Sequence, residues 1–279
     1  MNPIGIFAKT FPGQSALPVL SAARQAGYDC VQFNLACCGL PAMPDSLDGE
    51  TVRSIAAAVS ETGIAIAALS GTYNMIHPDP AVRRQGLTRL ARLLAHARAI
   101  GTRLVTLCTG TRHRDDPWHH HPDNEGPEAW SLLLTEMEQA AALAERFEVD
   151  LGIEPEMANV VSSARLARQL LEDIGSERLR IVLDSANIVP SAQADQDRIF
   201  GEAADLLGGR IAILHAKDRD TDGMMMPPGE GIIDFPLFFQ HVGQTGFAGA
   251  VITHGLSAGD APAAAAFLKA RLRTVDQSP

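Results

Sequence analysis

The sequence has no long uninterrupted hydrophobic segment. None of its apolar runs reaches the ~18 uncharged residues that a membrane-spanning helix needs, so we expect no membrane segment. The N-terminal residues MNPIGIFAKTF lack a basic stretch followed by a long apolar core, and we expect no signal peptide. The chain also lacks an excess of positive charge, since its formal net charge is −10. This acidity disfavours binding to nucleic-acid phosphates, so we expect a small-molecule substrate as the partner.

Cysteine is scarce as well. The chain has four cysteines, in no zinc-finger spacing, and two of them, Cys37 and Cys38, are adjacent. This is a poor disulfide framework, and we predict reduced thiols in a cytoplasmic protein. The chain contains no linker, low-complexity tract or block of like charge, which predicts one domain over residues 1–279. The sequence leaves open whether the chain forms a homo-oligomer.

Eight short apolar runs alternate with segments of helical periodicity along the whole chain. The runs are IGIF (4–7), CVQFN (30–34), IAIAAL (64–69), RLVTLC (103–108), DLGIE (150–154), RIVLD (180–184), IAILH (211–215) and AVIT (250–253). Their nearly continuous apolarity is typical of strands covered on both faces. Eight is the number of strands in a closed parallel barrel. We therefore predict an α/β fold, a single (β/α)₈ TIM barrel.

Three connections in this pattern are long and polar. They comprise residues 35–50, 109–127 and 216–234, and each follows a strand and precedes a helix. In a β/α barrel such loops form the face that carries the active site. Long loops in a compact domain are usually functional or disordered. We expect the site on this face.

Residues of metal-ligand type end four successive apolar runs. They are Glu154, Asp184, His215 and His254, separated by 30, 31 and 39 residues. Each separation suits a strand, a helix and two loops, a unit of about 30 or more residues. In neighbouring parallel strands all four side chains would gather at the C-terminal mouth of the barrel. Two carboxylates and two imidazoles at one place predict a divalent metal site.

Each of these residues also has an interpretation that involves no metal. Glu154, which precedes Pro155, would be a loop carboxylate, and Asp184 would be the N-cap of the next helical turn. His215 or His254 alone would be a hydrogen-bonded core residue. These interpretations would all have to hold at once, at four equivalent strand ends. A shared site is therefore favoured.

The segments IEPE, LDSAN, HAKD and GEGIIDFPLFFQHVGQTGFAGAVIT resemble the sugar-phosphate isomerase/epimerase superfamily of xylose-isomerase-like TIM barrels, or AP endonuclease family 2. Its members include ketose 3-epimerases, hydroxypyruvate isomerases, inosose dehydratases and endonuclease IV. The resemblance implies one divalent ion held by Glu, Asp, His and Glu on strands five to eight. The first three positions correspond to Glu154, Asp184 and His215. It further implies that the ion chelates adjacent oxygens of a carbonyl sugar while the two Glu residues move a carbon-bound proton.

The chain departs from that pattern at two positions. His254 stands where the second Glu is expected, and Asn187 stands where many members have a substrate-binding His. Imidazole is softer than carboxylate, so we expect one divalent ion of Mn, Zn, Co, Ni or Fe rather than Mg. His254 could replace the Glu as acid or base near neutral pH, but not easily through the nitrogen that ligates the metal. Alternatively, His254 is no ligand and water takes its place.

Other polar residues near the strand ends are candidates for substrate binding. Glu156 and Asn187 follow the ligand positions, and Lys217 and Arg219 follow His215. The two basic side chains would hold a carboxylate, phosphate or enediolate oxygen, or they would belong to a solvated loop.

Residues 111–126 form a histidine-rich loop with one tryptophan. We expect this loop to be a lid over the mouth, with Trp118 stacking on substrate and His121 near the metal. A mobile surface loop is the alternative.

These observations predict a metal-dependent isomerase or epimerase of a small sugar or keto-acid that works through an enediolate, with Glu154 and His254 as catalytic residues. One alternative is a lyase of the inosose-dehydratase kind, since it would share the same half-reaction. A non-catalytic small-molecule-binding barrel is another alternative, because the second Glu is missing. A DNA-repair endonuclease is disfavoured by the acidic charge and by Asn187, which interrupts the required Asp-x-x-His pattern.

Overall fold

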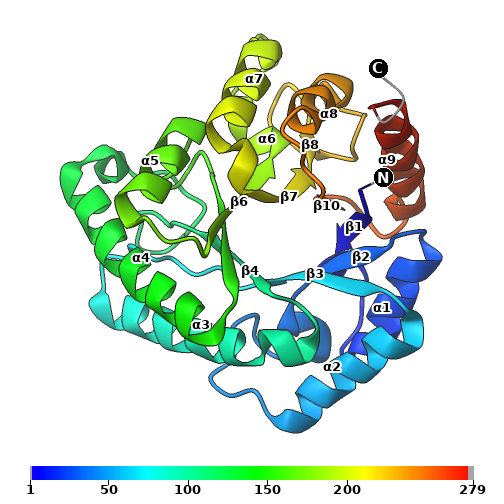
Figure 1. Ribbon diagram of the computed structural model, residues 1–279, viewed down its shortest axis with the longest axis horizontal. Coiled ribbons are helices and arrows are strands. Elements are labelled where there is room, and N and C mark those ends of the chain that lie inside the picture. The colour runs from blue at the N-terminus through cyan, green and yellow to red at the C-terminus, as the bar shows by residue number, and fades with distance from the viewer. Residues whose placement is uncertain (1, 276–279) are drawn as a thin grey trace.

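Eight parallel strands close into a barrel in the computed structural model, which describes residues 2–275 (Figure 1). The strands are β1 (Ile4–Phe7), β2 (Cys30–Phe33), β3 (Ala65–Ser70), β4 (Leu104–Cys108), β5 (Asp150–Glu154), β6 (Leu179–Asp184), β7 (Ile211–Ala216) and β10 (Ala250–Thr253). Each lies within one residue of its predicted bounds. β10 pairs with β1 and closes the ring, so the predicted (β/α)₈ barrel is confirmed.

Helices follow the strands and surround the barrel (Figure 1). The principal ones are α1 (Ala16–Gln25), α2 (Gly49–Thr62), α3 (Pro80–Ile100), α4 (Pro127–Phe147), α5 (Ala164–Ile174), α7 (Gln196–Leu207), α8 (Phe235–Gly243) and α9 (Ala261–Val275). Their ends follow the sequence signals. The Asp79 carboxylate caps α3 before Pro80, and the Ser163 hydroxyl caps α5. Among the described residues no helix is long and apolar enough to cross a membrane.

The interior of the barrel has an apolar layer with a polar layer above it. Because side chains on a strand alternate between faces, residues two apart point the same way. The apolar layer contains Cys30, Ala68, Leu104, Val182, Ile213 and Ile252, which form one buried cluster. Two positions further along the same strands stand Gln32, Ser70, Thr106, Asp184, His215 and His254. Because of this alternation, these six polar side chains form a ring at the C-terminal mouth of the barrel, which we call the polar ring.

The apolar layer is tightly packed at its base. A Cβ atom at Gly5 of β1 would lie 2.3 Å from Ile252 Cδ1 and 2.7 Å from Cys30 Sγ. A larger residue would therefore not fit there without a shift of its neighbours. This packing fills the barrel below the layer of polar side chains.

The three long connections lie on the C-terminal face, as predicted. The first contains the 3₁₀ turn η2 (Leu35–Cys38), and the second contains η3 (Pro122–Glu125). The third contains a small antiparallel hairpin of β8 (Asp218–Arg219) and β9 (Met225–Met226). The short helix α6 (Ser185–Ile188) follows β6 directly.

Candidate metal centre

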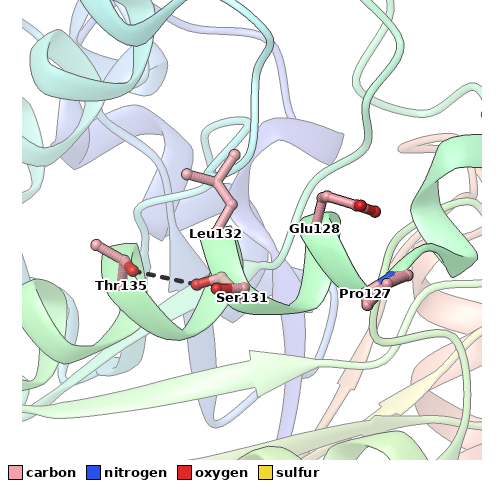
Figure 2. Close-up of a pocket in the computed structure, with 5 residues that line it drawn as sticks. All are labelled: Pro127, Glu128, Ser131, Leu132 and Thr135. Atoms are coloured by element: carbon pink, nitrogen blue, oxygen red, sulfur yellow. Dashed lines mark hydrogen bonds between the residues drawn. The ribbon is translucent and has the colours of Figure 1, made fainter.

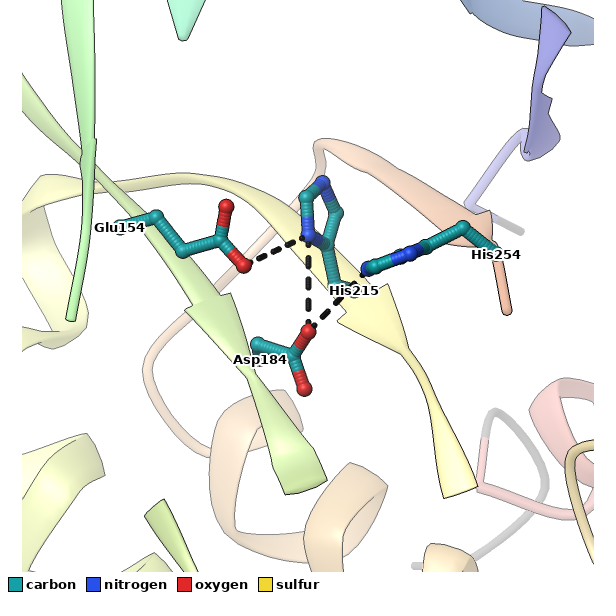
Figure 3. A group of neighbouring side chains, drawn as sticks. All are labelled: Glu154, Asp184, His215 and His254. Carbon is teal, nitrogen blue, oxygen red and sulfur yellow. Dashed lines mark hydrogen bonds and ion pairs between the residues drawn. The ribbon is translucent and has the colours of Figure 1, made fainter. Parts of the chain in front are cut away.

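The four residues predicted as metal ligands converge at the ends of β5, β6, β7 and β10 (Figure 3). Oε1 of Glu154 lies 3.2 Å from Nδ1 of His215. Oδ2 of Asp184 lies 3.7 Å from the same nitrogen and 3.3 Å from Nε2 of His254. The side chains come from strands far apart in sequence but adjacent in the barrel. The predicted convergence is therefore confirmed.

Asp184 has two roles, one for each carboxylate oxygen. Oδ1 accepts hydrogen bonds from the backbone amides of Ala186 and Asn187, at 2.8 and 3.2 Å, and so caps α6. Oδ2 faces the imidazoles of His215 and His254. The N-cap interpretation of this residue is therefore confirmed, and its role as a metal ligand stays a prediction. The cap fixes the carboxylate so that Oδ2 points into the cluster.

Lys217 is part of the cluster and is buried, with 8% of its surface exposed. Its Nζ lies 3.1 Å from Oδ2 of Asp184 and donates to Oδ1 of Asn187. The alternative of a solvated loop residue is therefore wrong for Lys217. Asn187 in turn donates from Nδ2 to Oε1 of Glu154, at 3.0 Å. Asn187 thus links Lys217, which contacts Asp184, to Glu154.

The charged side chains of this cluster shift one another's pKa values. Burial works against the charged form of His215, but the charges and hydrogen bonds of Glu154 and Asp184 outweigh it and raise its pKa to about 9. Burial lowers the pKa of His254 despite its hydrogen bond to Asp184. Burial alone would raise the pKa of Asp184, but Lys217 and the two imidazoles hold it well below its usual value.

The directions of these pKa shifts describe a cluster in which positive and negative charges balance. Burial works to raise the pKa of Glu154 too, but His215 outweighs it and lowers that pKa. Two carboxylates are then matched by the imidazolium of His215 and the ammonium of Lys217, with His254 neutral. A divalent ion would have to displace the His215 proton and share Asp184 with Lys217.

The donor set fits a divalent cation. One ligand atom from each of Glu154, Asp184, His215 and His254 lies within 4.8 Å of the other three. Bonds of about 2.0–2.2 Å in a tetrahedral site place ligand atoms about 3.4 Å apart. Carboxylate and imidazole together are the donors that Zn²⁺, Mn²⁺, Fe²⁺, Co²⁺ and Ni²⁺ accept. These four side chains would hold the ion.

Two further predicted residues follow Glu154 and His215 in the sequence. Glu156 is partly buried; burial raises its pKa, and Lys217 opposes that shift only in part. Arg219 donates from its guanidinium to the carbonyl of Val189, while its Nε is buried without a hydrogen-bond partner among the described residues. Arg219 is thus held against the loop after α6. A role for Glu156 or Arg219 in substrate binding stays a prediction.

The histidine-rich loop is anchored at its base and exposed at its tip. Asn124 is buried and donates to the carbonyl of Ala158, and Asn159 donates to the carbonyl of Pro117. Trp118 is 54% exposed. The His121 imidazole caps η3 by accepting from the amide of Asp123, and it is not among the four clustered ligands. The lid function and the substrate contacts of this loop stay predictions.

Sequence reasoning missed two buried polar residues. Gln32 accepts a hydrogen bond from Nε2 of His215 at 2.8 Å. The sequence feature that could have indicated it is a polar residue inside the apolar run CVQFN. The carboxylate of Asp218 accepts from the amides of Gly229, Gly231 and Ile233, at 2.9 to 3.1 Å. The segment Gly229–Gly231 therefore wraps around this carboxylate. A Cβ at Gly231 would lie 2.3 Å from Asp218 Oδ1, so the wrap requires glycine there.

A second hollow lies on the outside of the barrel and carries no such chemistry. Figure 2 shows that its lining side chains all belong to the first turns of α4, with the Thr135 hydroxyl donating to the carbonyl of Ser131 at 3.1 Å. The other lining residues are Pro127, Glu128 and Leu132. None of them belongs to the cluster at the mouth.

Comparison with known proteins agrees with this architecture. The family model described as xylose isomerase-like TIM barrel matches residues 20–271. The chain belongs to this family. The L-ribulose-5-phosphate 3-epimerase UlaE of Escherichia coli (strain K12) is 24% identical over 262 residues, covering 88% of this chain and 84% of that protein. The predicted family is therefore confirmed.

Two solved structures show the same fold. An L-ribulose 3-epimerase superposes with a TM-score of 0.77 at 20% identity, covering 99% of this chain and 96% of that one. A xylose isomerase-like TIM barrel protein from Mycobacterium smegmatis, in complex with magnesium, superposes with a TM-score of 0.72 at 13% identity, covering 99% and 98%. At these identities the likeness concerns the fold.

Proposed function

We propose that this protein is a divalent-metal-dependent isomerase or epimerase of a small sugar or keto-acid. The observation that carries the proposal is the convergence of Glu154, Asp184, His215 and His254 in a chain of this family. The similarity to 3-epimerases of ribulose and its phosphate favours a ketose as substrate. When bound, the ion would polarise the carbonyl and lower the cost of forming an enediolate.

Glu154 is the residue we assign as the base. Its Oε1 is engaged by His215 and Asn187, whereas Oε2 has only a weak contact, 3.9 Å from the thiol of Cys108. Oε2 is therefore free to take a proton from the carbon beside the carbonyl. The side chain is 13% exposed, so it remains accessible from the mouth while most water is excluded. Lys217 would hold a developing enediolate oxygen through its ammonium group.

On the second face of the substrate, the site lacks the carboxylate that the family pattern predicts. His254 stands there, with 26% of its side chain exposed and its pKa lowered by burial. A neutral imidazole is a metal ligand or a base, but a single nitrogen does not easily do both. If His254 ligates, only Glu154 moves protons. One-base chemistry favours 1,2-isomerisation or elimination over 3-epimerisation, so a lyase of the inosose-dehydratase kind is the second candidate.

The test combines metal analysis with product analysis. Tag-free protein should contain about one divalent ion per chain by elemental analysis. Incubation with ketoses, their phosphates and inososes in D₂O should incorporate deuterium beside the carbonyl of the true substrate. NMR of the products then separates an epimer or aldose from an eliminated product. Bound metal with no deuterium incorporation into any of these substrates would contradict the enzymatic proposal and leave a binding barrel.

A further inference from the structure

Three buried side chains on β2, β3 and β4 form hydrogen bonds that lead to His215. Gln32, Ser70 and Thr106 are 4%, 8% and 2% exposed. Nε2 of Gln32 donates to Oγ of Ser70 and to Oγ1 of Thr106, both at 3.2 Å. Oε1 of Gln32 lies 2.8 Å from Nε2 of His215, on the opposite side of the barrel. The chain of contacts thus crosses the interior just beside the metal cluster.

The donors and acceptors of the Gln32 amide determine which group donates in each of these hydrogen bonds. A glutamine has two N–H donors and one carbonyl acceptor. Ser70 and Thr106 accept both N–H groups, which directs the amide nitrogen toward β3 and β4 and the carbonyl oxygen toward His215. A carbonyl oxygen only accepts, so Nε2 of His215 carries the hydrogen. The other ring nitrogen, Nδ1, then faces Glu154 and Asp184.

We infer that Gln32 is a positioning residue that selects the Nε2–H tautomer of His215 and so makes Nδ1 the metal-binding nitrogen. The inference rests on the proposed metal-dependent function and names a residue outside its ligand set. Metal-binding histidines commonly donate their second N–H to an oxygen, which fixes the tautomer and the ring orientation. In this chain the oxygen belongs to a neutral amide. It orients the ring without adding a third negative charge beside Glu154 and Asp184.

The contacts of Gln32 leave no polar group of its side chain unused. Both N–H groups and the carbonyl oxygen have a protein partner within 3.2 Å. An apolar residue of similar size would leave the N–H of His215 without an acceptor at a buried position. Once the imidazolium has lost one proton, the remaining hydrogen would then be free to stay on Nδ1, toward Oε1 of Glu154. That tautomer has no lone pair for a metal on the cluster side.

Zn²⁺ binding to the intact chain tests this inference directly. Gln32→Leu should weaken Zn²⁺ binding about ten- to hundredfold in competition with a chromogenic chelator. The matched control is Thr109→Val, which removes a buried hydroxyl that accepts from the amide of Val161 and is not part of the four-residue cluster. It should lose comparable thermal stability while keeping its Zn²⁺ affinity within about twofold.

The tautomer itself provides a second readout that packing alone would not change. In ¹⁵N-histidine spectra of the Zn²⁺-loaded protein, the signals of His215 are assigned from a His215→Gln variant. We expect an N–H at Nε2 in the wild type and a loss of this single tautomer in Gln32→Leu. Gln32→Glu should restore it, because a carboxylate also accepts from Nε2. Ser70→Ala with Thr106→Val should have a smaller effect, about tenfold or less in affinity, because Gln32 remains.

The outcomes separate the two proposals. A folded Gln32→Leu variant with wild-type affinity and an unchanged tautomer would overturn the inference. If that variant does not fold, the same spectra of Gln32→Glu and of the Ser70→Ala, Thr106→Val double variant test the inference. An N–H at Nδ1 of His215 in Gln32→Glu would contradict it. Wild-type protein that takes up no Zn²⁺ would overturn the metal-dependent function together with this inference. Zn²⁺ uptake without activity on any carbonyl sugar would overturn only the function.

Discussion

The ammonium nitrogen of Lys217 lies 3.1 Å from Oδ2 of Asp184, the same oxygen that faces both imidazoles of the cluster. Lys217 is therefore a built-in cation beside a predicted cation site. In the metal-free protein it is the closest charged partner of this buried carboxylate, with the imidazolium of His215 at 3.7 Å as the second. The same contact makes Lys217 a competitor of any metal that binds Asp184.

We predict that Lys217→Met raises the affinity for Zn²⁺ about tenfold or more, because it removes a positive charge a few ångströms from the ion. The metal-free variant should be destabilised by up to about 3–5 kcal/mol, since Asp184 loses its closest charged partner and keeps only the more distant imidazolium of His215. Zn²⁺ should then raise its melting temperature more than that of the wild type. The control is Lys269→Met. In the wild type, Lys269 donates to the carbonyl of Gly27, in another part of the fold. Equal Zn²⁺ affinity in all three proteins would refute competition by Lys217.

The pKa of His215 predicts the pH dependence of metal binding. Its value of about 9 in the fold lies above the usual 6.5, so the ring is protonated at neutral pH. A metal needs the neutral imidazole and must release this proton. Apparent Zn²⁺ affinity should therefore rise with pH, by up to about tenfold per unit below pH 9, and then level off. Titration calorimetry in buffers of different ionisation enthalpy should give release of about one proton at pH 7.

The same pKa has a consequence for stability in the absence of metal. A group whose pKa is raised by folding stabilises the fold fully below its unfolded value and loses that contribution as the pH rises through its folded value. For His215 this window runs from 6.5 to about 9. The melting temperature in EDTA should fall across it. His215→Gln should flatten the slope, and an unchanged slope in that variant would assign the titration to another group.

Substitutions at His254 should show how this chain differs from its relatives. His254→Glu would add a third carboxylate, and we expect a shift of metal preference toward Mg²⁺ or Mn²⁺ and a gain of 3-epimerase activity. His254→Gln should weaken Zn²⁺ binding about ten- to hundredfold, because it removes one of the clustered donor groups. Elemental analysis and product ratios check both variants. If neither metal content nor turnover changes in either, His254 is not part of the site.

The exposed side chain of Trp118 offers a test of the lid. The chain has two tryptophans, and Trp130→Phe leaves Trp118 as the one indole reporter. Because Trp118 is 54% exposed, its burial by substrate should shift its fluorescence to shorter wavelength and protect residues 111–126 from protease. Trp118→Ala should raise KM more than it lowers kcat if the ring mainly stacks on the substrate. Unchanged fluorescence and cleavage at saturating substrate would favour a surface loop.

Much of the site could be predicted because a closed parallel barrel converts sequence order into spatial order. Glu154, Asp184 and His215 end consecutive strands, and strands of one direction bring their C-terminal ends to one mouth. The apolar runs fixed the strand positions to within one residue. His254 could be placed on the same ground, since it directly follows β10.

The contacts across the barrel could not be predicted. Gln32 and His215 are 183 positions apart and sit on strands that are not neighbours, so no periodicity connects them. Lys217 follows the strand end by one residue, and a loop lysine is usually solvated. Its burial depends on where Asp184 and Asn187 point, which is decided by packing.

The sequence by itself determined the fold, the family resemblance and the side-chain types at the mouth, because strand length, apolar periodicity and spacing are local properties of the chain. The tertiary structure decided how those side chains are charged and oriented. It set Lys217 and an imidazolium at His215 against two carboxylates, divided the oxygens of Asp184 between a helix cap and the cluster, and placed the Gln32 carbonyl on His215. Protonation and tautomer depend on distances of a few ångströms between distant residues, and only the folded chain fixes such distances.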